Sequence, residues 1–325
     1  MREVTWVLPG ADLPQEYLTF ERALPQWDVP TLNLWRRFAR RRSETRQGGD
    51  LLAHTFVGSL KAKLRQALDL AADTPCFLAA PVSQHMDLHS MQVTAGDELR
   101  LSWTEAHRAA NALNEFLQEN GWECHVYRPD LWLMTYPQNL DWHAPDVWSL
   151  HGRADADSKI TGADAAQMLQ RLTETQMLLF AHAQHAPRAD ASLPAVNGLW
   201  WWQDSVGCAA ADAAVVADIT WLPESDRLLQ TEQFNWQDIK QFAADHDRVT
   251  VYAEGASRAL QRLDMAAHTA FLQRFDRECL QAAWQDMLAG SLQTCRVISE
   301  RSVLTMNAAR RWQWWRRERP YRGSV

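Results

Sequence analysis

The 325-residue sequence has few cysteines and no long apolar run, and each shortage excludes a class of protein. The five cysteines are widely spaced and include no CxxC pair, which argues against a disulfide framework or a structural zinc site. No apolar stretch approaches the roughly 20 residues that a membrane-spanning helix needs. Because the amino-terminal segment also lacks the pattern of a secretory signal, we expect a cytoplasmic protein.

Common catalytic motifs are missing as well. The sequence contains no GxSxG nucleophile motif and no GxxxxGK phosphate loop. The hydrophobic content of 46% is nevertheless sufficient for a substantial core. The chain should therefore be globular, and any catalytic group would have to be assembled from distant segments.

Arginine is concentrated in two short segments of an otherwise acidic chain. The net charge is -7, yet residues 36–46 and 310–322 each contain six arginines and one glutamate, so each carries +5 and the remainder -17. Such segments favour docking to a partner or pairing within the molecule. The tail, 310–322, also mixes arginine with tryptophan, as nucleic-acid-binding and membrane-surface segments do. Docking of the tail on the chain's own body is favoured, because an acidic body weakens the attraction to phosphates.

The order of predicted elements favours an α/β fold with an open sheet covered by helices. The pattern predicts strands at 3–8, 215–219, 249–253 and 294–299, and helices at 31–42, 236–244 and 256–288. A strand-rich stretch with one helix follows residue 75 and ends in an irregular segment. We therefore expect a main body made of 1–75 and 150–325, and an inserted lobe with its return loop at 76–149.

Residues 171–202 organise this scheme. They predict the end of an amphipathic helix that is apolar over nearly its whole circumference and therefore buried, then a polar connector, then an aromatic strand that opens at Asn197. The connector contains His182, His185 and Arg188. Cationic residues at this place are also expected from the helix dipole alone.

This order resembles the bacterial RpfE-type proteins (regulation of pathogenicity factors). The resemblance lies in the QMLL helix end, the His- and Arg-containing loop and Pro194–Asn197, and it extends to Leu8-Pro9-Gly10, Ala80-Pro81-Val82 and the tail. More remotely, the chain is similar to the archaeal-type cofactor-independent phosphoglycerate mutases. That similarity implies an alkaline-phosphatase-like α/β fold, and an anionic ligand near His182, His185, Arg188 and Asn197.

The same similarity implies a catalytic site that this chain does not complete. The mutases need a metal-binding Asp after the first strand and a Ser nucleophile, whereas the matching places hold Pro9 and Asp50. An expected late Asp-His pair is replaced by Glu300-Arg301, and an arginine would repel a cation. We therefore assign no catalytic residue and expect no cofactor.

Two other patterns could contribute metal ligands. His85, Asp87 and His89 alternate along an extended segment, and Asp264 and His268 share a helix face at i and i+4. Each pattern also fits an ordinary solvated surface, because metal sites require three or four converging ligands.

Three functions remain open at this point. The first is a non-catalytic phosphoglycerate-mutase-like protein that acts as a binding or regulatory module for a protein or a small anion. The second is a metal-dependent phosphate-ester hydrolase or mutase with a rearranged site. The third is a nucleic-acid or membrane-surface binder that uses the arginine segments. Substrate, partner and oligomeric state are not determined by the sequence.

Overall fold

The chain folds into two compact units. A computed structural model describes residues 1–14, 18, 24–86, 91–150, 160–181, 185–219, 222, 225–262, 264–312, 316–317 and 320–325. Unit 1 comprises Met1–Val57 and Gly207–Val325, and unit 2 comprises Gly58–Val206. Where the chain passes between the units, β3 (Val57–Ser59) and β9 (Val206–Cys208) pair as a two-stranded sheet. Among the described residues, no helix has the length and apolar character needed to span a membrane.

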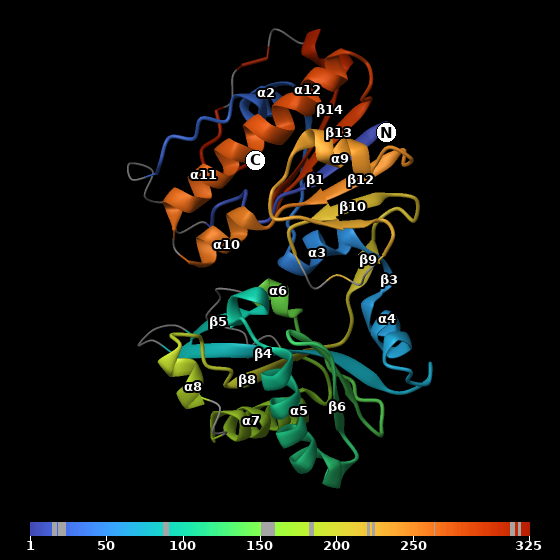
Figure 1. Cartoon of the computed structure of the whole chain (residues 1–325), viewed down its shortest axis with the longest axis vertical. Helices are drawn as coiled ribbons and strands as arrows, with labels where there is room; N and C mark the ends of the chain where they lie inside the picture. Colours follow the sequence, from blue (N-terminus) through green and yellow to red (C-terminus); the bar gives the residue numbers. More distant parts are fainter. Residues whose placement is uncertain are drawn as a thin grey trace. The chain divides into compact units, whose positions relative to one another are not determined.

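The described residues of unit 1 form a seven-stranded mixed sheet in the order β11-β10-β12-β1-β13-β14-β2 (Figure 1). Its strands are β1 (Glu3–Val7), β2 (Arg40–Ser43), β10 (Ala214–Ala217), β11 (Leu228–Gln230), β12 (Arg248–Tyr252), β13 (Thr294–Ile298) and β14 (Ser302–Asn307). The strands from β11 to β13 are parallel, whereas β14 and β2 run antiparallel to their neighbours. The carboxyl ends of the parallel strands therefore meet at one edge, which is where open α/β sheets place ligands.

Helices cover the face of this sheet that carries Val4 and Trp6. Their side chains join one hydrophobic cluster with residues of α2, α9, α11 and α12. The Trp6 ring packs against Trp236 and, edge-on, against Phe275, each at a centroid distance of 5.5 Å. The elements that accompany the sheet are α2 (Pro30–Phe38), α3 (Gly48–Leu52), η2 (Ala53–Thr55), α9 (Trp236–Phe242), α10 (Gly255–Gln261), α11 (Met265–Phe275), the π-helical η6 (Asp276–Leu280), α12 (Gln281–Leu288) and η7 (Ala308–Trp312).

A carboxylate from η6 fixes the start of α2. The residue that precedes α2, Val29, offers no side-chain cap. Asp276 instead accepts hydrogen bonds from the backbone N–H groups of Thr31 and Leu32, at 3.1 and 2.7 Å. Because unpaired N–H groups at a helix start need acceptors, this distant cap orients α2 on the sheet.

Unit 2 is built around the long strand β4 (Cys76–Met86). It pairs antiparallel with β5 (Met91–Ala95), β7 (Leu131–Thr135) and β8 (Gly198–Trp202), while β6 (Glu123–Arg128) pairs with β7. Helix α5 contacts β6, α7 contacts β8, and the two helices contact each other (Figure 1). The helical elements are α4 (Leu60–Ala67), η3 (Gly96–Leu99), α5 (Trp103–Leu117), η4 (Gln118–Asn120), α6 (Val147–Leu150), α7 (Ala165–Ala181) and α8 (His185–Asp190).

The predicted fold class is confirmed, because a helix-covered open α/β sheet is interrupted by a strand-rich unit. The limits of the inserted unit differ from the predicted 76–149. Unit 2 extends to Val206 because β8 pairs with β4, and α7 packs on β8. Long-range strand pairing of this kind leaves no local mark in the sequence.

Three predicted helices also need correction. The predicted helix at 31–42 ends at Phe38, because Arg40–Ser43 pairs as β2 with β14. The predicted helix at 256–288 is divided into α10, α11, η6 and α12. Helix α7 is buried on one side only: Met168 and Leu172 face inward, whereas Met177 is 69% exposed, because α7 lies at the surface of unit 2.

The cysteines provide a test of this fold. Cys76, Cys124, Cys279 and Cys295 are buried, and only Cys208 among the five is exposed. Burial raises the pKa of the Cys279 thiol to about 12, so that thiol is both inaccessible and un-ionised at neutral pH. We expect maleimide to add one label to the native protein and five after denaturation, as measured by intact mass. Cys208→Ser should remove the native label, and a second fast label in the native state would contradict the fold.

Candidate functional site

The loop that follows β1 passes through the carboxyl edge of the parallel strands. Gly10 adopts a φ of +79°, which favours glycine, and a Cβ atom added there would lie 2.4 Å from the backbone nitrogen of Ser257. This loop therefore packs directly on the start of α10. A larger residue at position 10 would push the two segments apart.

Glu300, two residues beyond β13, accepts hydrogen bonds from backbone N–H groups of this loop. Its Oε1 accepts a hydrogen bond from Gly10 N at 2.5 Å, and its Oε2 accepts one from Asp12 N at 3.3 Å. The pKa of the Glu300 carboxyl is raised to about 7, chiefly by burial and also by the nearby Asp12, while the N–H donors oppose this rise. One carboxylate therefore serves two backbone donors of the same loop, Gly10 N and Asp12 N.

Asp12 extends the network to the final residues of the sequence. Its Oδ2 accepts from Arg301 N at 2.8 Å, and its Oδ1 accepts from Val325 N at 2.7 Å. The Tyr321 hydroxyl donates to the carbonyl of Ala11 at 2.6 Å, and burial raises the pKa of Tyr321 well above its ordinary value. Residues 321–325 thus lie against the loop after β1.

His268, in α11, forms a hydrogen bond to the same loop. It is fully buried, and its Nε2 lies 3.0 Å from the carbonyl oxygen of Gly10. A carbonyl oxygen can only accept, so Nε2 carries the proton. Burial lowers the pKa of His268, which keeps the ring neutral, and Nδ1 has no hydrogen-bond partner among the described residues.

A second buried carboxylate, Asp218, follows β10. It accepts from the backbone N–H groups of Glu254 and Gly255, at 2.8 and 3.1 Å, and it pairs with Arg258 at 3.3 Å. Burial raises the pKa of Asp218 to about 6, although Arg258 and the N–H donors favour its charged form. Asp218 therefore caps the start of α10.

Of the predicted metal ligands that the structure describes, Asp264 and His268 bond to different partners. Asp264 is exposed and caps α11 through Ala267 N at 2.8 Å, whereas His268 donates to Gly10. His85 is an exposed residue of β4, and Asp87 and His89 lie outside the described residues. In the part of the chain that the structure describes, no three His, Cys, Asp or Glu side chains are placed to hold a metal ion.

Two predicted anion-binding residues make contacts inside unit 2. Arg188 is 2% exposed and donates to Glu105 at 2.6 Å, to the Pro194 carbonyl at 2.8 Å and to the Leu99 carbonyl. Asn197 exchanges two hydrogen bonds with the backbone of Gln84, at 2.7 and 2.8 Å. These contacts fix α8 and the start of β8.

The other two predicted residues are not placed by the structure. His182 and the side chain of His185 lie outside what the structure describes. A ligand at His182, His185, Arg188 and Asn197 stays a prediction.

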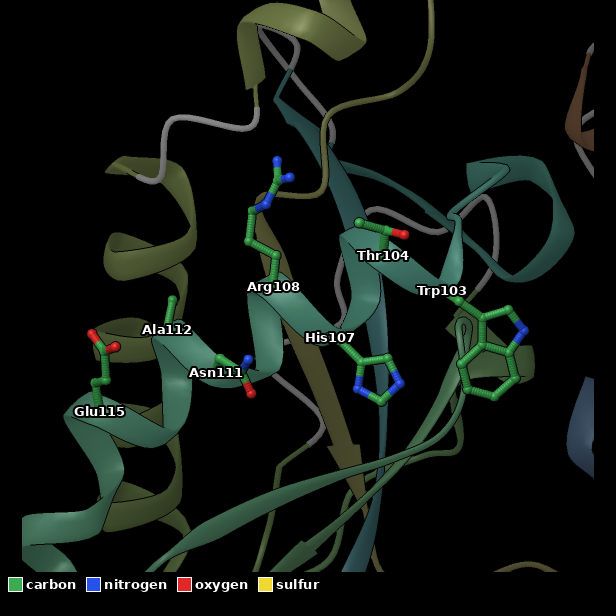
Figure 2. A pocket seen from close by; sticks show the side chains of 7 residues that line it. All are labelled: Trp103, Thr104, His107, Arg108, Asn111, Ala112 and Glu115. Carbon is green, nitrogen blue, oxygen red and sulfur yellow. The ribbon is translucent and has the colours of Figure 1, made fainter.

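Helix α5 presents an open hollow of about 660 Å³ (Figure 2). Trp103 and His107 stack at a centroid distance of 5.8 Å, and Figure 2 shows Arg108 and Glu115 extending from later turns of the same helix. The described lining residues all come from α5. Because no described opposing wall contributes a side chain, the hollow offers a surface rather than a converging catalytic set.

Sequence reasoning overlooked Asp12 and Asp218, and interpreted Glu300 only as a replaced metal ligand. One signal was available, because Asp218 and Glu300 each come directly or almost directly after a buried strand. Parallel strands bring such residues to one edge. Their hydrogen-bond partners could not be read from the sequence.

Comparison with known proteins gives remote structural similarities, and two of them are described here. No protein-family model and no curated protein sequence matches this chain. The cofactor-independent phosphoglycerate mutase from Thermoplasma acidophilum is 13% identical, with 94% of this chain and 89% of that chain covered and a TM-score of 0.39. The PH0037 protein from Pyrococcus horikoshii is 10% identical, with 94% and 87% covered and a TM-score of 0.48.

These identities and TM-scores are too low to carry over a function or a site residue. The predicted remote similarity to phosphoglycerate mutases has a counterpart among solved structures, whereas the RpfE-type relationship stays a prediction.

Proposed function

We propose that this chain is a non-catalytic, phosphoglycerate-mutase-like protein that acts as a binding or regulatory module. The observation that carries the proposal is the position of Glu300. Its carboxylate occupies the two loop donors, Gly10 N and Asp12 N, at the edge where an open α/β sheet would hold an anionic ligand.

Three other ionisable groups that the structure describes at this edge also make structural hydrogen bonds. Asp218 caps α10, Asp12 holds Arg301 N and Val325 N, and neutral His268 donates to Gly10. A catalytic carboxylate or histidine must instead face the reacting atoms. Phosphoryl transfer would therefore require this network to be dismantled.

The proposal predicts no phosphoryl-transfer activity. Purified protein with Mn²⁺ or Zn²⁺ should neither hydrolyse p-nitrophenyl phosphate nor interconvert phosphoglycerates above the rate of a heat-denatured blank. Asp218→Asn and Glu300→Gln should leave that background unchanged. Metal-dependent turnover that disappears in Asp218→Asn would support the rearranged-enzyme alternative and overturn the proposal.

Removing the internal carboxylate should expose an anion site. Glu300→Ala leaves two buried N–H groups without an acceptor, so we expect a loss of about 2 kcal/mol in the free energy of unfolding. Millimolar phosphate should then raise the Tm of Glu300→Ala by several degrees, because it binds only the folded variant. The wild type and the exposed control Glu232→Ala should show no such rise, and an equal rise in all three would contradict the role of Glu300.

Glu300 should also make stability depend on pH. The unfolded chain releases this proton around the ordinary pKa of 4.5, and the folded chain around 7. Between these values the folded state holds more protons, so stability is fully present below pH 4.5 and falls as the pH rises through 7. The shift corresponds to roughly 3 kcal/mol. Urea unfolding at pH 5 and pH 7.5 should show this fall in wild type relative to Glu300→Gln; parallel pH profiles would contradict it.

A further inference from the structure

The structure brings the two arginine segments together, although they lie far apart in the sequence. The Arg37 Nε donates to the Arg316 carbonyl at 2.8 Å, and Arg316 Nη1 donates to the carbonyl of Ala39 at 2.9 Å. Tyr321 N donates to Asn33 Oδ1 at 2.6 Å. The described part of the tail therefore docks on α2, and Arg316 caps the carbonyl end of that helix.

The first segment continues into β2, which is the outermost strand of the sheet. Within the described residues its one neighbour is β14, and all four residues of β2 are exposed. Glu44 N donates to the Arg301 carbonyl, so the backbone groups of Glu44 face β14. Every second residue of the strand does the same. By alternation, Arg40 and Arg42 direct their backbone groups at β14, and Arg41 and Ser43 direct theirs outward.

Within the part of the chain that the structure describes, the outer edge of β2 combines backbone groups that have no partner with two arginines that have no ion pair. Arg41 and Ser43 make no outward backbone hydrogen bond within the described chain, and Arg40 and Arg41 have no ion pair there. Arg42 pairs with Glu44. A second copy of this chain would bring like charges against this edge, which opposes self-pairing.

We propose that β2 binds an extended, acidic segment of a partner protein as an added strand. The outward N–H and C=O groups of Arg41 and Ser43 would pair with the partner backbone. Carboxylates of the partner would face Arg40 and Arg42 on one side and Arg41 on the other. A peptide is favoured over nucleic acid because an unpaired strand edge recognises a peptide backbone, and because the rest of the chain carries -17.

This inference deepens the proposed binding role by naming the chemistry of a partner. It does not depend on the role proposed for Glu300. A peptide-binding assay tests β2, whereas a turnover assay tests the carboxyl edge of the sheet. Failure of one would leave the other standing.

Fluorescence anisotropy with a labelled (Glu-Thr)5 peptide tests the proposal. Two controls separate strand pairing from charge: the same peptide N-methylated at alternate residues, and a dT10 oligonucleotide. We expect (Glu-Thr)5 to bind at low salt, and the N-methylated peptide and dT10 to bind at least tenfold more weakly. Equal binding of the N-methylated peptide would overturn strand addition, and tighter binding of dT10 would identify a nucleic-acid surface instead.

Matched variants locate the site. Arg40→Glu/Arg42→Glu should weaken (Glu-Thr)5 at least tenfold, whereas Arg227→Glu/Arg248→Glu, with the same charge change at exposed positions elsewhere in unit 1, should not. All four side chains are exposed, so both variants should fold, which circular dichroism would check. In the wild type the peptide should slow hydrogen exchange at the amides of Arg41 and Ser43. Unchanged exchange there, or equal loss in both variants, would overturn the assignment.

Discussion

Unit 1 depends on one requirement: a carboxylate that is removed from water must receive hydrogen bonds. Glu300 meets it through the amides of Gly10 and Asp12. Asp12 in turn accepts from Arg301 and Val325, so the segments that follow β1 and β13 and the final residues form one network. Breaking any member would leave buried donors or a buried charge unpaired, which is more costly than the bond itself.

That network lies at the carboxyl edge of the parallel strands, where open α/β sheets place ligands. The parallel strands deliver acidic residues to their carboxyl edge, as they do in enzymes of this architecture. Here Asp218 and Glu300 point at backbone N–H groups, and neutral His268 points at a carbonyl. The β2 edge is exposed because β14 turns back antiparallel and places β2 outermost.

Unit 2 shows how the same polar residues can indicate either structure or function. Arg188 and Asn197 resemble a ligand-binding pair, yet one reaches Glu105 across the unit and the other extends the pairing of β8 with β4. A buried arginine needs acceptors for several donors, and Glu105 and two carbonyl groups supply them. The open face of α5 presents a hollow in this unit.

The sequence by itself determined the local features: the strands of the main sheet at 3–8, 215–219, 249–253 and 294–299, and the uneven distribution of arginine. These depend on residue spacing within a few positions. Only the tertiary structure decided the limits of unit 2, the residues on which the tail docks and the hydrogen-bond partners of Glu300. Gly10 and Glu300 are 290 positions apart, and their contact depends on the pairing of β1 with β13. No local pattern encodes that register, so the partner of a buried carboxylate became visible only in the fold.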